Sequence, residues 1–222
     1  MTRKTMHASR PGWRSALVFC ALLCCVAAGR AATDEAQVSA PAPSTAQATA
    51  QALCDALLQL MKQGSGLDFA ARVKMLDPTL RRLYDMPLVT RLVVGAPWRS
   101  MSADEQQQVL AAFSDYSVAV YAGRFKSYSG ERFVVDPATS TLASGDAIAH
   151  TKLYPHGGEP VELDYLERQE SGSWRIIDVL LSGTISEMAE RRSEYASALR
   201  DGGATALVHL LRDKSAQLAA QR

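Results

Sequence analysis

The chain has 222 residues, of which 47% are hydrophobic and 21% are charged, with 24 Lys and Arg against 23 Asp and Glu. The first 31 residues contain five of the basic residues and no acidic residue, so the remainder has 19 basic against 23 acidic residues, a net charge of −4. This balance argues against nucleic acid as a partner, because nucleic-acid binding is driven by phosphate neutralisation, and against tight electrostatic docking on an anionic membrane surface.

Residues 1–31 have the three parts of a secretory signal peptide. Four basic residues come first (Arg3, Lys4, Arg10 and Arg14), and an apolar run, 15–28, and small residues follow. The apolar run is too short to span a bilayer comfortably, which disfavours an uncleaved membrane anchor. We therefore expect an exported protein from which residues 1–31 are removed.

Residues 32–48 are rich in Ala, Thr, Ser and Pro and have almost no large apolar residue, so they are predicted to form a disordered leader. Residues 49–222 are then predicted to form a single domain, long enough to build a core without disulfides. Cys54 is the only cysteine after the signal segment, so no intramolecular disulfide is possible there. Its apolar helical surroundings indicate a core or partner-facing residue.

Short helices are predicted for the first part of the domain. Apolar periodicity and helix-stop signals place them at 48–62, at 69–76, at 79–84, and from Leu88 to Gly95. Pro78, Pro87 and Pro97 punctuate this region, and an aspartate before a proline is typical of a helix start. Short, proline-broken helices predict a curved wall rather than a straight bundle.

The longest predicted helix begins at Ser102, which has capping-box spacing with Glu105, and runs to about Tyr128. Its apolar stripe is rich in aromatic residues and is expected to pack on a sheet. Ser117 and Arg124 lie within the same stripe, although a dry core seldom contains such residues. This combination favours a cavity with a solvated mouth.

Beyond Gly130 the apolar pattern repeats every two residues, which is typical of strands. Four strands are predicted, separated by Gly-containing and Pro-containing turns, at 133–136, 147–154, 161–168 and 174–182. The last of them is apolar on most of both faces, so we expect it inside the sheet rather than at its edge.

Two helices are predicted after the strands. Thr184 and Glu187 have capping-box spacing and predict a helix to about Leu199, and a second helix is expected at 204–219, after Gly202-Gly203. The predicted fold class is therefore α+β, with a twisted four-stranded antiparallel sheet covered by helices and an apolar cavity between them.

Motifs for metal-dependent or nucleophilic catalysis are absent from the sequence. His150, His156 and His209 are isolated, and there is no phosphate-binding loop, no G-x-S-x-G and no convincing pair of catalytic carboxylates. We therefore expect no metal site, no cofactor and no enzymatic activity.

Asp178 is an exception among the acidic residues, because it lies in the middle of an apolar strand, where an unpaired charge is costly. A structural salt bridge to Arg91, Arg99 or Arg132 is the favoured interpretation. The alternative is a catalytic base.

Two segments resemble the MlaC-type periplasmic lipid carriers, also called toluene-tolerance auxiliary components of ABC transporters. In the first, 85–113, the residues Gly95, Trp98, Gln106 and Phe113 match the family pattern, and Y-A-G-R-F-K-S-Y-S-G-E-R-F at 121–133 continues it. The second segment is W-R-I-I-D-V-L-L-S-G-T-I-S at 174–186. The run R-R-S-E-Y at 191–195, with Gly202-Gly203, is similar to the hopanoid-associated HpnM branch, whereas ordinary MlaC proteins usually have Asn-Tyr-Arg there.

This resemblance implies a cone of nuclear-transport-factor-like shape around an apolar cavity, with lipid tails inside and the head group near the mouth. It implies a periplasmic protein that moves a hopanoid or a phospholipid between the inner and outer membranes, with membrane-bound transporter components as partners. Burial of each methylene group contributes about 0.8 kcal/mol, so a lipid needs an enclosed apolar carrier to cross water. In such a carrier, the helices around the three prolines are a candidate gate.

The residues expected to line the lipid cavity are apolar or aromatic side chains from the helices and strands described above. They are Val93, Trp98, Phe113, Val120, Tyr121, Phe125, Tyr165, Ile176, Leu180, Ile185 and Met188. Two other hypotheses stay open. One is an enzyme that acts on a steroid-like apolar substrate with a cavity-facing acid or base such as Asp178. The other is an adaptor with a solid core that only binds the transport machinery.

Overall fold

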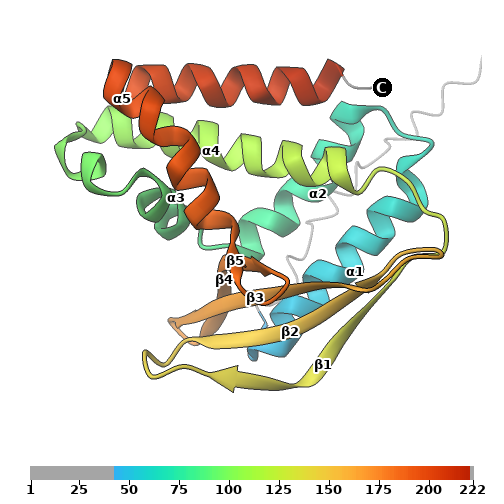
Figure 1. Cartoon of the computed structure of the whole chain (residues 1–222). Coiled ribbons are helices and arrows are strands. Elements are labelled where there is room, and N and C mark those ends of the chain that lie inside the picture. The colour runs from blue at the N-terminus through green and yellow to red at the C-terminus, as the bar shows by residue number, and fades with distance from the viewer. Residues whose placement is uncertain (1–42, 221–222) are drawn as a thin grey trace, which may run out of the picture. The chain divides into compact units, whose positions relative to one another are not determined.

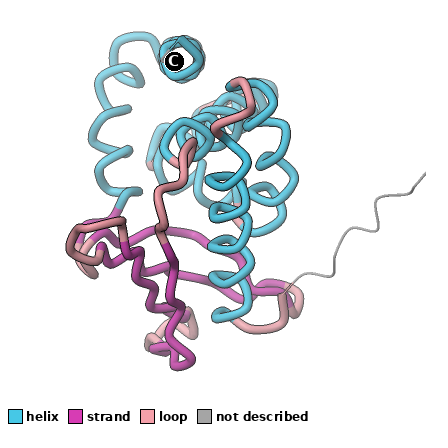
Figure 2. Tube along the Cα trace, turned by 90° about the vertical axis from the view of Figure 1, so that its right-hand side faces the viewer, coloured by secondary structure: helices cyan, strands magenta, loops and turns pink. Residues whose placement is uncertain are grey.

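The computed structural model describes residues 43–220 and has an α+β fold, with helices on one face of an antiparallel sheet (Figures 1 and 2). The predicted signal peptide and most of the predicted leader lie outside the described residues. The elements are α1 (Ala46–Gly64), α2 (Phe69–Leu83), α3 (Met86–Val94), the 3₁₀ helix η1 (Ala96–Ser100), α4 (Ala103–Arg124), β1 (Arg132–Thr141), β2 (Ala147–Tyr154), β3 (Val161–Glu170), β4 (Ser173–Leu181), β5 (Ile185–Ser186) and α5 (Glu187–Ala220).

Helix α1 begins at Ala46, so residues 46–48 of the predicted leader form its first turn. The side chain of Thr45 accepts a hydrogen bond from the Ala48 amide at 3.1 Å and caps the helix. Three leucines on one face of α1, Leu53, Leu57 and Leu60, are fully buried. The apolar periodicity of the sequence therefore predicted this helix correctly, because its apolar face packs into the core.

Helix α2 corrects the prediction of a break at Pro78, because it continues through this proline from Phe69 to Leu83. Leu76, Leu80 and Leu83 are all buried on the same face. Burial of this leucine row outweighs the hydrogen bond that a proline removes from a helix interior. The other two prolines lie in the first turns of α3 and η1, where a missing amide hydrogen has no cost.

The capping box predicted at the start of α4 is confirmed. The Glu105 amide donates to the Ser102 hydroxyl at 3.3 Å, and the Glu105 carboxylate accepts from the Ser102 amide at 2.8 Å. The helix ends at Arg124, four residues before the predicted end. Its residues Val109, Phe113, Ser117 and Val120 are buried against neighbouring elements.

The sheet has five strands rather than the four predicted, in the order β1-β2-β3-β4-β5, with every neighbouring pair antiparallel. The additional strand, β5, is two residues long and pairs Ile185 with Leu181 and Ser186 with Leu180. So short a strand has no alternation that a sequence pattern could reveal. Strand β1 runs through Pro137, with a register shift between Val135 and Thr139 that accommodates the proline.

Helix α5 has two segments, as predicted, which meet at a kink at Gly202 and Gly203. Gly203 has φ 60° and ψ −145°, a conformation that is open mainly to glycine. Residues 187–201 rise from the sheet, and residues 204–220 run along α4 (Figure 1). The first segment is capped by Ser186 rather than by Thr184, since the Ser186 hydroxyl accepts from the Ala189 amide at 3.0 Å.

Candidate functional site

A small pocket lies where the first segment of α5 crosses over α3, α4 and strand β4. Its lining comes from these elements and from the turn after α2: Tyr84, Met86, Val89, Phe113, Ser117, Tyr121, Ile177, Asp178, Val179, Glu187, Met188 and Arg191. The cavity volume is about 30 Å³. In this structure the pocket therefore has room for only a few water molecules.

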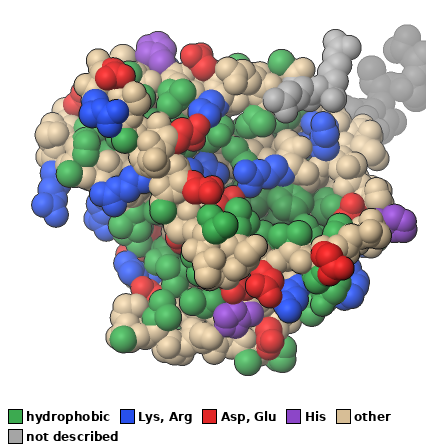
Figure 3. Space-filling view, in the orientation of Figure 1, with side chains coloured by type: hydrophobic (Ala, Val, Ile, Leu, Met, Phe, Trp, Pro, Cys, Tyr) green, Lys and Arg blue, Asp and Glu red, His purple; other side chains and the backbone are tan. Residues whose placement is uncertain are grey.

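An aromatic row connects this pocket with the first strand of the sheet. The ring centroids of Tyr84 and Tyr121 are 6.1 Å apart, those of Tyr121 and Phe125 are 5.9 Å apart, and those of Phe125 and Phe133 are 6.1 Å apart. Figure 3, which has the orientation of Figure 1, shows hydrophobic side chains in a hollow between the helices and the sheet. The apolar surface thus extends beyond the small cavity itself.

The hydroxyl groups of Tyr84 and Tyr121 are hydrogen-bonded to each other at the inner end of this row. Burial raises the pKa of both phenols, so both stay protonated at neutral pH. Because each hydroxyl has a partner, these two polar atoms can lie in an apolar environment without an unpaired group.

Asp178 lines the pocket, but its partner is not one of the arginines that the sequence suggested. Its carboxylate accepts hydrogen bonds from the Ser186 hydroxyl at 2.5 Å, from the Val179 amide at 2.7 Å and from the Met188 amide at 3.1 Å. Burial raises the pKa of Asp178, and these three hydrogen bonds oppose the rise. Asp178 therefore ties the N-terminus of α5 to β4, where the helix dipole also favours a negative charge.

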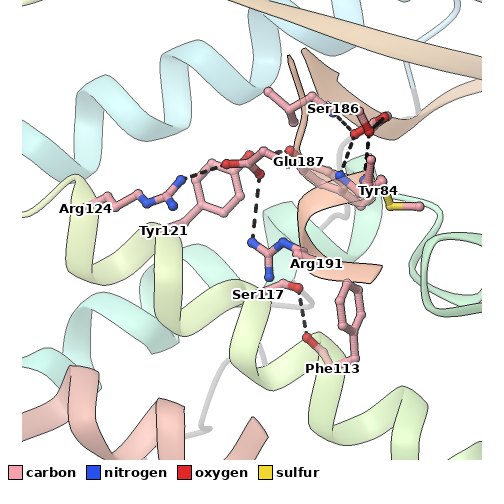
Figure 4. A network of polar contacts seen from close by, with 12 residues as sticks. Tyr84, Phe113, Ser117, Tyr121, Arg124, Ser186, Glu187 and Arg191 are labelled. Atoms are coloured by element: carbon pink, nitrogen blue, oxygen red, sulfur yellow. Dashed lines mark hydrogen bonds and ion pairs between the residues drawn. The ribbon is translucent and has the colours of Figure 1, made fainter. Parts of the chain in front are cut away.

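A polar network closes the other side of the pocket, between α4 and α5 (Figure 4). Glu187 lies between two arginines: its carboxylate is 2.8 Å from the Arg124 guanidinium and 3.9 Å from that of Arg191. The Ser117 hydroxyl donates to the Phe113 carbonyl at 2.8 Å. The sequence singled out two polar residues in the α4 stripe, and both lie at this site. Ser117 lines the pocket, and Arg124 pairs with Glu187 at its edge.

The described residues offer no metal centre and no membrane-spanning helix. Between residues 43 and 220, no three His, Cys, Asp or Glu side chains are grouped to bind a metal ion. Within the same range, no helix combines the length and the apolar character needed to cross a bilayer.

Comparison with known proteins decides the family. Residues 51–213 match the family described as MlaC protein. The chain belongs to the MlaC family. The matched range includes every residue that lines the pocket.

A solved structure with the same fold is that of a phospholipid-binding protein from Ralstonia solanacearum in complex with a phospholipid. The two chains are 24% identical, the match covers 78% of this chain and 98% of the other, and the TM-score is 0.68. The two proteins therefore have the same fold.

Three of the eleven residues predicted for the lipid site line the pocket of this MlaC-family protein: Phe113, Tyr121 and Met188. Phe125 lies next to them in the aromatic row. Their role in lipid binding stays a prediction.

The other seven predicted residues lie outside the pocket lining. Val93, Tyr165 and Ile176 are buried in the core, Val120 lines a groove between α4 and α5, and Leu180 is half-buried on β4. Trp98 lines an outer groove with three arginines, Arg91, Arg99 and Arg192. Ile185 on β5 is 47% exposed.

Sequence reasoning missed seven of the pocket residues, namely Tyr84, Met86, Val89, Ile177, Val179, Glu187 and Arg191. Glu187 and Arg191 are the least expected of them, because they are charged. A charged residue on an amphipathic helix ordinarily predicts a solvated face. For Arg191 the available signal was the R-R-S-E-Y run, which was assigned to a branch of the family but not to a site, and Glu187 was noted only for its capping-box spacing with Thr184. Their burial arises only because α5 folds back across α4 and β4.

Proposed function

We propose that this protein is a lipid carrier whose cargo is held between the first segment of α5, helices α3 and α4, and strand β4. The observation that carries the proposal is the aromatic and apolar pocket at this position in a chain of the MlaC family. The phospholipid bound to the Ralstonia protein of the same fold supports it. An apolar enclosure is the chemistry that a lipid needs in water.

The cavity of about 30 Å³ is far smaller than the 300–1,000 Å³ that is usual for ligand pockets, so a lipid requires the pocket to open. The first segment of α5 is suited to move. It lies between Gly183, with φ 71°, and the glycine kink at 202–203, and its lower end is held by hydrogen bonds to Asp178 and by the Arg124–Glu187 ion pair. In this proposal α5 replaces the proline-broken helices as the principal gate, because α2 is continuous.

The cargo that we propose is a hopanoid or a phospholipid. The Ralstonia protein favours the phospholipid, whereas the R-R-S-E-Y run at 191–195 favours the hopanoid-associated HpnM branch and a rigid polycyclic cargo. A cone of nuclear-transport-factor-like shape, opened by α5, would receive either one.

We also propose that the protein works in the periplasm and moves its lipid between the inner and outer membranes. The signal-like segment at residues 1–31 supports export. Membrane-bound transporter components are the expected partners, since a carrier must receive its lipid from one membrane and deliver it to another.

The test is native mass spectrometry of the protein purified from its own source, followed by organic extraction of the bound molecule. A bound hopanoid supports the carrier function and the branch. A bound phospholipid supports the carrier function and overturns the hopanoid assignment. Protein that carries no lipid, and that takes up neither lipid from vesicles, contradicts the carrier function and favours an adaptor.

One observation favours the enzyme hypothesis, namely that Asp178 faces the pocket with a raised pKa. However, both carboxylate oxygens already accept hydrogen bonds from Ser186, Val179 and Met188. A general base needs a free oxygen that faces the substrate. We therefore assign Asp178 to the attachment of α5 and favour the carrier.

A further inference from the structure

Arg191 is a nearly buried cation with an unused hydrogen-bond donor at the edge of the pocket. Its side chain is 14% exposed, and its Nη2 atom is 3.9 Å from the Glu187 carboxylate. The other terminal nitrogen, Nη1, is buried and has no hydrogen-bond partner among the described residues. The guanidinium carbon is 5.8 Å from the ring centroid of Phe113 and 5.4 Å from that of Tyr116, so two aromatic rings lie beside this cation.

Tyr195 lies one turn further along the same face of α5 and also has a buried polar atom. Its hydroxyl is buried and makes no hydrogen bond of full geometry among residues 43–220. Burial raises the pKa of the Tyr195 phenol to about 12, and the neighbouring Arg191 guanidinium opposes this rise, so the two polar groups lie beside each other. Its ring packs edge-on against Phe113, with the centroids 6.5 Å apart. Two neighbouring polar groups of α5 that no hydrogen bond of full geometry satisfies thus lie against one aromatic ring of the pocket. Buried donors of this kind are rare and costly unless another molecule supplies the acceptor.

The charges around the pocket indicate which acceptor fits. The charged side chains of the lining are Arg191, Glu187 and Asp178, one cation and two carboxylates. An ionised phosphate brought to Arg191 would compete with Glu187 for the guanidinium and would be repelled by both carboxylates. An uncharged oxygen accepts from Nη1 without this repulsion and leaves the Glu187–Arg191 pair in place.

We propose that Arg191 is the polar anchor of the pocket and donates from Nη1 to an uncharged oxygen of the lipid, with the Tyr195 hydroxyl as a second donor. This inference rests on the proposed carrier function and deepens it. Suitable oxygens are the hydroxyl group of a polycyclic alcohol or the ester carbonyl of a glycerolipid. A phosphate head group then stays outside α5, in solvent.

The experiment offers the protein two pairs of lipids in mixed vesicles and counts the bound species by native mass spectrometry. The first pair is a diacyl phosphatidylcholine and its dialkyl ether analogue, which lacks the ester carbonyls. The second is a hydroxylated pentacyclic triterpenoid and its parent hydrocarbon. We expect a preference of about tenfold for the member that carries the ester carbonyls or the hydroxyl group, the effect of one hydrogen bond to a charged donor. A preference in the first pair identifies a glycerolipid carbonyl, and one in the second identifies an alcohol.

The variant Arg191→Met should remove the preference, so that the two members of each pair are taken up equally. Arg192→Met is the matched control, since Arg192 is exposed and packs over Gly95 in the outer groove, and it should keep the preference. Tyr195→Phe, which removes one hydroxyl and preserves the ring, should reduce it and serves as the second variant if Arg191→Met does not fold.

Three results overturn the proposal. The unmodified protein takes up lipids without preference in either pair, in which case the carrier function stands and the anchor does not. Arg191→Met or Tyr195→Phe keeps the full preference, in which case another group recognises the oxygen. The protein takes up no lipid at all, in which case the carrier function fails as well.

Discussion

Replacing Glu167 by Gln should stabilise the protein by an amount that grows with pH. Glu167 is fully buried on β3, at the register shift that follows Leu166, and neither carboxyl oxygen has a hydrogen-bond partner among the described residues. Thr49 on α1 lies beside it, but the Thr49 hydroxyl is within hydrogen-bond distance of the Thr45 and Trp174 carbonyls. Burial raises the pKa of Glu167 from 4.5 to about 9, so the carboxyl is neutral in the folded protein at pH 7.

The magnitude follows from the difference between the folded and unfolded pKa. At pH 7 the unfolded chain has released this proton and the folded chain retains it, so folding requires proton uptake that costs about 3 kcal/mol at 1.36 kcal/mol per pH unit above 4.5. The cost is almost absent below pH 4.5, grows as the pH rises, and levels off above the folded pKa at about 6 kcal/mol. Glutamine keeps the shape and cannot ionise, so it removes this cost.

Urea unfolding of the wild type and of Glu167→Gln at pH 5, 7 and 9 measures the effect. We expect the difference in the free energy of unfolding to be below about 1 kcal/mol at pH 5, about 3 at pH 7 and larger at pH 9. Glu170→Gln, on an exposed position of the same strand, is the control and should change stability by less than about 0.5 kcal/mol at each pH. A Glu167→Gln difference that does not vary with pH refutes the reasoning, because the carboxyl is then ionised in the folded protein.

Three further predictions concern the attachment of α5, its kink and the core. Asp178→Asn should lower the free energy of unfolding by about 1–2 kcal/mol, because its hydrogen bonds to Ser186 and Met188 become weaker. Amide hydrogen exchange should become faster in residues 187–201 but not in α1. Unchanged exchange in residues 187–201 contradicts the role of Asp178 in attaching α5. Gly203→Ala should lower the stability measured by thermal unfolding by about 1–3 kcal/mol, because the φ of Gly203 is 60°. The control is Gly66→Ala, where the added carbon has its nearest neighbour at 3.7 Å, and it should change stability by less than about 1 kcal/mol. Cys54 should react with a thiol reagent only as fast as the protein unfolds, since burial raises the pKa of its thiol to about 12; rapid labelling of the chain without residues 1–31 disproves this.

Local signals predicted the fold where local chemistry decides it. The strand at Ala147–Tyr154 has the predicted bounds, and the Ser102–Glu105 capping box begins α4 as its spacing indicates. Tertiary packing decided the rest. Pro78 is held inside α2 by a buried leucine face, and β5 exists only because Ile185 and Ser186 meet the end of β4. Neither effect has a signal within its own segment.

The site was only partly predictable for a related reason. Phe113, Tyr121 and Met188 are apolar or aromatic residues, for which burial is the ordinary expectation, and they do line the pocket. Glu187 and Arg191 are charged, and charged side chains are ordinarily exposed, so the same expectation gives no reason to place them in a pocket. Their burial depends on the path of α5 after the Ser186 cap and on the partners that α4 provides, Arg124 and Phe113.

Glu167 and Arg191 are both buried ionisable groups with unpaired atoms, but they lie in different places and should behave differently when replaced. Glu167 does not line the pocket, so no cargo oxygen can compensate for its cost, and its replacement should raise stability without changing lipid uptake. Arg191 lines the pocket, so in the proposed anchor role the cost of its unpaired donor is removed when a lipid oxygen binds. A residue that lowers stability but serves function is expected at a binding site and not elsewhere in the core. Measuring stability and lipid preference on both variants therefore separates a group kept for binding from a group that only weakens the fold.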